Sequence, residues 1–290
     1  MATFAAVDLG ASSGRVLVAD VDADRLVLHE AHRFANPPVA LPDGLHWDLL
    51  ALYRELLHGL RAAGRLLTER GLPALSGIGI DSWAVDYGLL DADGVLIANP
   101  YHYRDGRTGR GVERVHELVA PEQLYQRNGL QFLPFTTAYQ LAAEPAGRLA
   151  GAGTLLLVPD LLGYWLTGSI GAEVTNASTT GLLDVRTGRW DVELAGVLGF
   201  DPGLLPPLRR PGDLVGRLRP EVADETGLDP ATPVLAVGSH DTASAVVGVP
   251  ADGDRFGYVS CGTWSLVGLE LAAPVLTEAS SSPTLSLIHI

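Results

Sequence analysis

The segment Gly238-Ser239-His240-Asp241-Thr242 places a carboxylate where an apolar stretch meets a helical one. We expect residues 234–237 to form a buried strand and residues 243–247 a helix. A carboxylate at a helix N-terminus is stabilised in its ionised form, so Asp241 should be charged at neutral pH and able to accept a proton from a hydroxyl group. The alternative is that Asp241 serves only as a helix N-cap.

A second candidate site is the turn Gly10-Ala11-Ser12-Ser13-Gly14-Arg15, which follows Asp8 and separates two apolar strands expected at residues 4–9 and 16–19. Glycines let a backbone approach a ligand closely, and serines offer hydroxyl and N–H groups to a phosphate. Asp8 could reach a metal ion directly or through water. An ordinary hairpin turn is an equally good interpretation of this spacing.

Several further elements would surround these residues. A strand at 26–30 would complete an antiparallel meander, and a helix beginning after Asp48 would cover one face of it. A short strand at 78–81 leads into Ser82-Trp83-Ala84-Val85-Asp86, which suits the floor of a small-molecule pocket or a turn whose Trp83 packs in the core. The strands at 255–260 and 266–269 predict a second hairpin with a hydroxyl-rich turn, similar to the first.

The composition excludes several classes of function. The chain has 290 residues and a formal net charge of -14, which argues against nucleic acid and anionic membranes as partners. All 20 basic residues are arginine, so Walker-type phosphate loops and Schiff-base lysines are excluded. A single cysteine, Cys261, excludes an internal disulfide framework. The N-terminus has no signal-peptide pattern, and we expect a cytoplasmic protein.

Taken together, these segments resemble the FGGY family of carbohydrate kinases over residues 5–278. The matching motifs are Asp8-Leu9-Gly10-Ala11-Ser12-Ser13-Gly14-Arg15, Asp81-Ser82-Trp83-Ala84-Val85-Asp86, Tyr103-Arg104-Asp105, Gln131-Phe132-Leu133-Pro134-Phe135, Ser239-His240-Asp241-Thr242-Ala243-Ser244-Ala245 and Gly262-Thr263-Trp264-Ser265. The resemblance implies an α/β fold similar to actin and hexokinase, built on ribonuclease-H-like sheets, with ligands bound in a cleft. It also implies ATP and Mg²⁺ as cofactors and a small ketose as substrate.

The resemblance also implies roles for individual residues. Asp241 would be the catalytic base, and Asp8 would hold the metal, directly or through water. The ATP-binding residues would be Ala11, Ser12, Ser13, Gly14, Arg15 and Thr263. The substrate-binding residues would be Ala84, His240, Asp241 and Thr242. At Ala84 the family pattern usually has glycine, so the added methyl group could alter the fit of the sugar.

Within the family, the block at 131–135 and the sequence His240-Asp241-Thr242 favour members that phosphorylate L-rhamnulose. One alternative is a kinase for fuculose, xylulose or another sugar. The other is an inactive sugar-binding fragment. Residues 1–230 would form the sugar-binding N-terminal domain, and residues 231–280 only the start of the C-terminal ATP-binding domain. The family-like pattern is lost near residue 279. We therefore expect residues 281–290 to be a foreign tail on a truncated frame.

Overall fold

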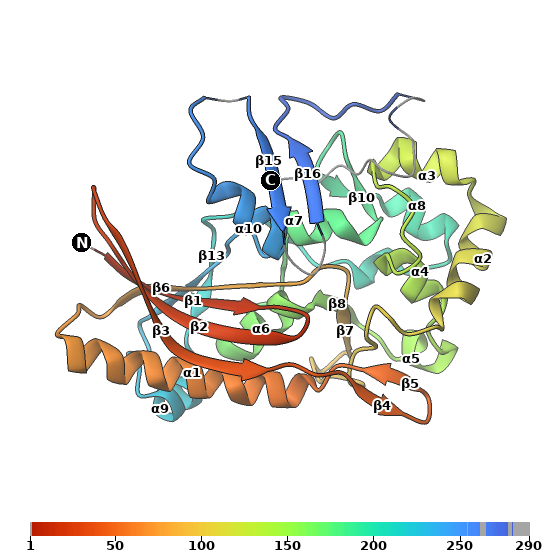
Figure 1. The fold of residues 1–290 in the computed structure, drawn as a ribbon. Helices are drawn as coiled ribbons and strands as arrows, with labels where there is room; N and C mark the ends of the chain where they lie inside the picture. Colours follow the sequence, from red (N-terminus) through yellow and green to blue (C-terminus); the bar gives the residue numbers. More distant parts are fainter. Residues whose placement is uncertain (1, 254, 262–264, 278–279, 281–290) are drawn as a thin grey trace.

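The computed structural model describes residues 2–253, 255–261, 265–277 and 280. Thr263 and the expected foreign tail at 281–290 lie outside the described residues. A mixed sheet and its helices form one side of the molecule, and a mainly helical region lies beside it (Figure 1). The α/β class expected from the sequence is confirmed.

The main sheet has six strands in the order β13-β14-β6-β1-β2-β3. Their bounds are β1 (Ala2–Leu9), β2 (Ser13–Val21), β3 (Leu26–Ala35), β6 (Leu75–Ser82), β13 (Leu214–Arg217) and β14 (Pro233–Leu235). The first three strands pair antiparallel and confirm the predicted meander. Strand β6 runs parallel to β1, and β14 runs parallel to β6. Buried and half-buried residues alternate along β1, as expected where one sheet face is the more deeply covered.

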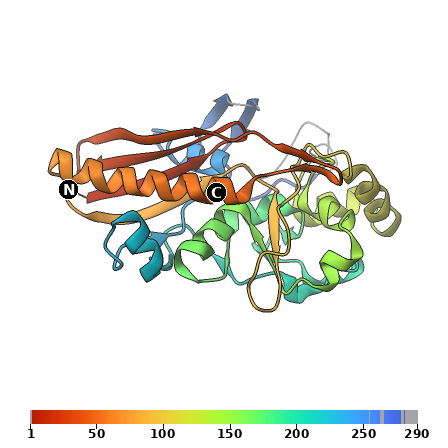
Figure 2. The same ribbon diagram turned by 90° about the horizontal axis from the view of Figure 1, so that it is seen from below.

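Helix α1 (Leu49–Arg70) lies along one face of this sheet (Figure 2). Its predicted N-cap is confirmed, because the Asp48 side chain accepts a hydrogen bond of 3.0 Å from the Ala51 N–H. Leucines at helical spacing, Leu49, Leu52, Leu56, Leu60 and Leu67, form its buried face. The helix approaches β2 so closely that a Cβ at Gly59 would lie 2.3 Å from Val16 Cγ2.

The region beside the sheet has its own apolar core. It contains the antiparallel pair β7 (Tyr87–Leu90) and β8 (Thr154–Leu157). The helices of the rest of the chain before residue 230 are α2 (Thr108–Leu118), α3 (Pro121–Asn128), α4 (Thr137–Ala142), α5 (Ala146–Ala150), α6 (Val158–Thr167), α7 (Val174–Ala177), α8 (Val192–Val197) and α9 (Pro220–Thr226), with 3-10 turns η1 (Ser178–Thr180) and η2 (Pro202–Leu204). Short strand pairs are β4 (Val39–Leu41) with β5 (Gly44–His46), β10 (Leu183–Asp184) with β11 (Arg189–Trp190), and β9 (Ala172–Glu173) with β12 (Leu208–Arg209).

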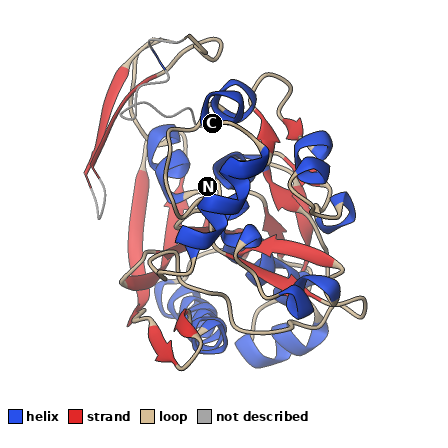
Figure 3. Ribbon diagram, turned by 90° about the vertical axis from the view of Figure 1, so that its right-hand side faces the viewer, coloured by secondary structure: helices blue, strands red, loops and turns tan. Residues whose placement is uncertain are grey.

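The last described elements are α10 (Asp241–Val247) and the hairpin of β15 (Gly257–Cys261) and β16 (Ser265–Leu269). The predicted second hairpin is thus present, and it projects from the rest of the molecule (Figure 3). It exposes apolar side chains, with Val267 at 83% and Leu269 at 71% exposure. The domain boundary expected at residue 230 stays a prediction, although β14 beyond it belongs to the same sheet as β1.

Candidate active site

A cavity of about 440 Å³ lies where β1 and β6 end and α10 begins. Most of the residues singled out in the sequence line it: Asp8, Ala11, Ser12, Ser13, Arg15, Ala84, His240, Asp241 and Thr242. Gly14 is not among the lining residues, because it packs under strand β3, where a Cβ would lie 2.3 Å from Phe34 Cζ. Ser260 and Leu266 of the projecting hairpin also line the cavity.

The sheet topology explains why residues so distant in sequence meet here. The parallel pairing of β1 and β6 places Asp8 opposite Asp81 and Leu9 opposite Ser82. Beyond the end of β14 the chain continues alongside β6, with Ser82 bridged to His240. The Ser82 N–H donates to the Ser239 carbonyl at 2.9 Å. Three carboxyl ends of parallel segments therefore converge, which is where α/β sheets commonly bind ligands.

Asp241 is the first residue of α10, and His240 is its N-cap. The alternative reading of Asp241 as the N-cap is therefore wrong. One Asp241 carboxylate oxygen accepts hydrogen bonds from its neighbour Thr242, at 2.6 Å from the N–H and 3.2 Å from the hydroxyl. Burial raises the pKa of Asp241, outweighing these hydrogen bonds, and the charge of Asp8 adds to the rise. The helix N-terminus was expected to lower the pKa of Asp241, so the observed rise is opposite to that expectation. A carboxylate with a raised pKa is a stronger base when it is ionised.

His240 is 8% exposed, and burial lowers its pKa to about 4. Its imidazole is therefore neutral at physiological pH and can donate one hydrogen bond and accept another. Within the described residues, its Nδ1 atom has no hydrogen-bond partner. His240 Nε2 lies 3.5 Å from an Asp241 carboxylate oxygen. The pair offers a polyol both a neutral hydrogen-bonding group and a base.

The neighbouring acidic residues Asp8 and Asp81 have different environments. The Asp8 carboxylate is paired with Arg15 Nε at 3.0 Å. Asp81 is half-buried, and desolvation of its carboxyl, followed by the charges of Asp8 and Asp241, raises its pKa to about 8. Its Oδ1 atom has no hydrogen-bond partner among the residues that the structure describes. Asp81 is therefore mostly protonated at neutral pH, and Asp8 is the carboxylate able to face a cation.

The turn between β1 and β2 is held by hydrogen bonds from outside it. The Asn36 N–H donates to the Ser12 carbonyl and the Asn36 amide to the Gly10 carbonyl, both at 2.9 Å. The Gly10 N–H donates within the turn to the Ser13 carbonyl at 2.9 Å. A turn fixed in this way can present N–H and hydroxyl groups to an anion without rearrangement. The role of Asn36 was not foreseen, because it lies after β3, far from the turn in sequence.

An aromatic wall faces these polar groups, and Asp86 holds it in place. Asp86 is fully buried and accepts hydrogen bonds from Trp47 Nε1 at 2.6 Å, Trp83 Nε1 at 3.0 Å and the Tyr103 N–H at 3.1 Å on one oxygen. Gln140 Nε2 donates to the other oxygen at 2.7 Å. Burial raises the pKa of Asp86 to about 6 against the effect of these donors. Trp83 and Tyr103 line the cavity, so both expectations for Trp83 are met: it packs in the core and forms part of the pocket.

Next to Ala84, Val85 adopts a left-handed backbone with φ of 66°, which is rare for a β-branched residue. Its N–H donates to Thr179 Oγ1 at 3.3 Å, and its carbonyl accepts from Thr137 Oγ1 at 2.7 Å. Such strain persists where surrounding contacts fix it, commonly at functional sites. Nothing in the sequence indicates this conformation, because left-handed residues are usually glycine or asparagine.

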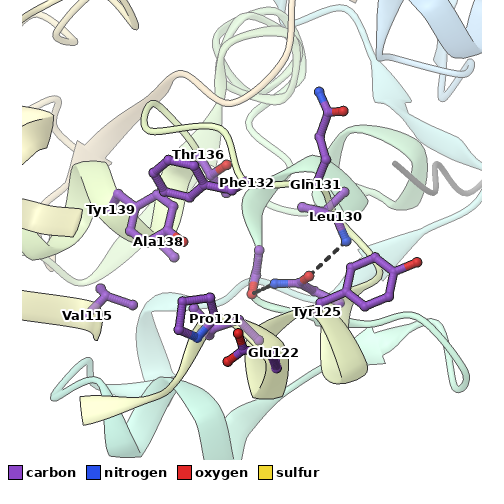
Figure 4. A pocket seen from close by; sticks show the side chains of 13 residues that line it. Val115, Pro121, Glu122, Tyr125, Leu130, Gln131, Phe132, Thr136, Ala138 and Tyr139 are labelled. Atoms are coloured by element: carbon purple, nitrogen blue, oxygen red, sulfur yellow. Dashed lines mark hydrogen bonds between the residues drawn. The ribbon is translucent and has the colours of Figure 1, made fainter. Parts of the chain in front are cut away.

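A smaller cavity of about 120 Å³ adjoins the first and shares Leu130, Gln131 and Thr136 with it. Figure 4 shows Phe132, Tyr139 and Thr136 gathered on one side of this cavity. Glu122 is its only carboxylate among the described residues. Because Asp8, Asp241, the turn after β1 and His240 all line the larger cavity, we place the candidate active site there.

No group of three or more histidine, cysteine, aspartate or glutamate residues is arranged to hold a metal ion in the part of the chain that the structure describes. Mg²⁺ in kinase sites is usually held by one or two carboxylates together with waters and substrate phosphates, so the Asp8 carboxylate fits such a shared ion. A cation bound there would favour the ionised form of the neighbouring Asp81, whose Oδ1 has no partner among the described residues. Over the same described ranges, no helix has the length and apolar character needed to cross a membrane.

Comparison with known proteins agrees with the sequence motifs. Residues 3–248 match the model of the N-terminal domain of the FGGY family of carbohydrate kinases. The chain is similar to a rhamnulokinase of Enterococcus faecalis, with 43% identity over 276 residues, covering 95% of this chain and 55% of the relative. A rhamnulokinase of Bacillus subtilis is 40% identical over 275 residues, covering 95% of this chain and 56% of that relative. The chain thus spans about half the length of the curated relatives it matches.

Solved structures have the same fold. A carbohydrate kinase from Novosphingobium aromaticivorans superimposes with a TM-score of 0.78 at 25% identity, over 96% of this chain and 58% of that one. A ligand-bound xylulose kinase from Lactobacillus acidophilus gives a TM-score of 0.75 at 19% identity, over 86% of this chain and 50% of that one. The actin- and hexokinase-like α/β fold expected from the motifs is confirmed.

Proposed function

Since the chain belongs to the FGGY family of carbohydrate kinases, we propose that the protein transfers the γ-phosphate of ATP to L-rhamnulose and yields L-rhamnulose 1-phosphate. The observation that carries this proposal is the convergence of Asp8, the turn after β1 and the segment His240 to Thr242 on one cavity. Phosphoryl transfer depends chiefly on positioning and charge stabilisation, and these groups supply both without lysine.

In this proposal Asp241 is the catalytic base. It takes the proton of the sugar's 1-hydroxyl as that oxygen attacks the γ-phosphorus, while the bond from the γ-phosphorus to the bridging oxygen breaks and ADP leaves. Its raised pKa suits proton abstraction near neutral pH. His240 and Thr242 would hydrogen-bond the sugar hydroxyls, and Ala84 would contact the sugar from the loop after β6.

The nucleotide would lie across the turn between β1 and β2. Ala11, Ser12 and Ser13 would offer N–H and hydroxyl groups to the phosphates, and Arg15 a positive charge. Gly14 would act indirectly, by letting the turn pack against Phe34. Thr263 would contact ATP from the second domain. Asp8 would hold Mg²⁺, which, when bound, neutralises charge on the transferring phosphate.

The identity of the sugar rests on relatives. Rhamnulokinases 38 to 44% identical to the chain support rhamnulose over fuculose or xylulose. We also propose that the N-terminal domain extends from β1 to α10, since the family match ends at residue 248 and β14 belongs to its sheet. The remaining residues would then begin the ATP-binding domain.

A kinase assay of the protein with rhamnulose, fuculose, xylulose and glycerol tests the proposal. We expect the highest kcat/KM with rhamnulose, and a higher value with another of these sugars would contradict the assignment. Asp241→Asn should lower kcat by roughly 100-fold or more with the sugar Kd changed little. Asp184→Asn is a matched control, because the Asp184 side chain accepts hydrogen bonds from the nearby Arg186 and Thr187 N–H groups in a turn that does not line the cavity.

The second candidate is a sugar-binding chain without kinase activity. The exposed apolar hairpin that carries Ser260 and Leu266 into the cavity favours it, because Val259 and Val267 of this hairpin are 65% and 83% exposed and so are little covered by the other described residues. Calorimetry separates the two candidates. Binding of rhamnulose without measurable binding of ATP supports the sugar-binding chain, whereas binding of both supports the kinase.

A further inference from the structure

Glu173 is a buried acidic residue outside the cavity lining, and its carboxylate connects two distant segments. It is 1% exposed and lies at the N-cap of α7, where it accepts hydrogen bonds from the Thr175 N–H at 3.0 Å and the Asn176 N–H at 3.3 Å. The same carboxylate also accepts from Ser239, at 2.9 Å from its N–H and 3.1 Å from its hydroxyl. Capping α7 requires the first two bonds only.

The partners of Ser239 are all supplied by other segments. Its carbonyl accepts from the Ser82 N–H at 2.9 Å and from Asn176 Nδ2 at 3.3 Å. The next residue is tied to the same helix, because the His240 N–H donates to Thr175 Oγ1 at 3.4 Å. Ser239 is 3% exposed, so none of these bonds is readily replaced by water.

The surroundings of Glu173 indicate that it acts as an acceptor. The described hydrogen bonds to its carboxylate all come from N–H or O–H donors, as an ionised carboxylate requires. Asp160 lies behind it and accepts from the Glu173 N–H at 3.1 Å. Burial, followed by the charge of Glu173, raises the pKa of Asp160, which favours the neutral form of this neighbouring carboxyl and lessens its repulsion of Glu173.

We propose that Glu173 is a positioning residue, whose carboxylate holds Ser239 so that His240 and Asp241 face the substrate. The proposal rests on the proposed function for the identity of the site. The hydrogen bonds between Glu173 and Ser239 are present whatever that function is. Segment 238–240 is outside the described strands and helices, and without Glu173 the Ser239 N–H and hydroxyl would lose their acceptor. Loss of this anchor should therefore displace the two site residues that follow it.

Glu173→Gln tests this role, because glutamine keeps the shape but its amide nitrogen cannot accept hydrogen bonds. Asp191→Asn is the matched control: Asp191 also caps a short helix, accepting from the Leu194 N–H at 2.9 Å, but it does not line the cavity. Two measurements are needed, the hydrogen exchange of the Ser239 and His240 amides in the 290-residue chain and the calorimetric Kd for rhamnulose.

We expect Glu173→Gln to lower the protection of these two amides about tenfold or more and to weaken rhamnulose binding by about tenfold, whereas Asp191→Asn changes neither. In an NMR titration, the pKa of His240 should move from about 4 toward that of an exposed histidine in Glu173→Gln only. A purely structural cap would lower the melting temperature without these site-specific changes.

Unchanged protection and unchanged His240 titration in folded Glu173→Gln would overturn the proposal. If that variant does not fold, Ser239→Ala removes one of the bonds while keeping the Ser239 N–H, and about threefold lower protection of the His240 amide is expected; no change there would also overturn the proposal. If the unaltered protein binds no rhamnulose, the proposed function fails, and the exchange and titration experiments still decide the role of Glu173.

Discussion

Replacing Asp86 with alanine should destabilise the fold and weaken the site together. The substitution leaves two indole N–H groups and the Tyr103 N–H without their acceptor, at about 1 to 2 kcal/mol each for buried donors. Gln140 retains an alternative acceptor, the Phe135 carbonyl at 3.0 Å. Burial of the Asp86 carboxylate raises its pKa from 3.8 to about 6, which corresponds to an unfavourable free energy of about 3 kcal/mol at pH 7. Asp86→Ala removes this unfavourable contribution and so offsets part of the loss. The expected net loss in unfolding free energy at pH 7 is about 2 kcal/mol.

The pH dependence gives this prediction a second test. The folded protein holds a proton on Asp86 up to about pH 6, whereas the unfolded chain releases it near pH 3.8. The contribution of Asp86 to stability is therefore larger at pH 5 than at pH 7. Urea unfolding followed by tryptophan fluorescence should show a greater deficit of Asp86→Ala at pH 5, by about 1 kcal/mol.

Binding should respond as well, because Asp86 orients Trp83 and the Tyr103 backbone at the cavity wall. We expect the rhamnulose Kd to rise about tenfold or more in Asp86→Ala. Asp91→Ala is the control, since Asp91 accepts from the N–H groups of Asp93 and Val95 in an exposed turn. A stability loss no larger than that of the control, or a deficit that shrinks from pH 7 to pH 5, would refute the reasoning.

Three further predictions concern stability. Leu56→Ala, at a fully buried position of α1, should lower the unfolding free energy by about 2 to 5 kcal/mol in urea titrations, and a loss below 1 kcal/mol would contradict the packing of this helix. Gly59→Ala should destabilise by about 1 to 3 kcal/mol through its contact with Val16. Gly64→Ala, whose Cβ would lie 3.2 Å from the flexible end of Leu228 and 3.8 Å from the Thr226 carbonyl oxygen, should be neutral or stabilising by up to about 1 kcal/mol; equal effects of the two substitutions would contradict this reasoning. Because burial lowers the pKa of His240 to about 4, its contribution to stability is present above pH 6.5 and is lost as the pH falls toward 4, and His240→Asn should flatten that part of the pH profile by about 3 kcal/mol.

Local patterns predicted much of the fold. The meander of the first three strands, the helix capped by Asp48 and the second hairpin are each encoded within a few neighbouring residues. These elements have apolar periodicity and turn chemistry that can be recognised without knowledge of the rest of the chain. The order of strands in the main sheet could not be predicted from local patterns, because the pairing of β14 with β6 joins residues more than 150 positions apart.

In the candidate site too, local patterns could be predicted from the sequence and long-range contacts could not. Asp8, the turn after it and Asp241 are recognisable by residue type and spacing, and the structure places them in one cavity. Asn36, Asp86 and Glu173 act through hydrogen bonds to residues from 17 to 66 positions away, and the left-handed Val85 is imposed by its surroundings. Such roles depend on tertiary contacts. The protonation of Asp81 and the raised pKa of Asp241 likewise follow from burial, which only the assembled fold defines.

The strand order also determines when the site can form during synthesis on the ribosome. Strands β1 and β6 can pair once about the first third of the chain has emerged, and they bring Asp8 and Asp81 together. The other edge of β6 stays unpaired until β14 is synthesised some 150 residues later, together with His240 and Asp241. At ~5 to 20 residues per second this interval is roughly 8 to 30 s. A nascent chain therefore carries an unpaired β6 edge for that time, and chaperone binding to ribosome-bound chains should decline once α10 has emerged.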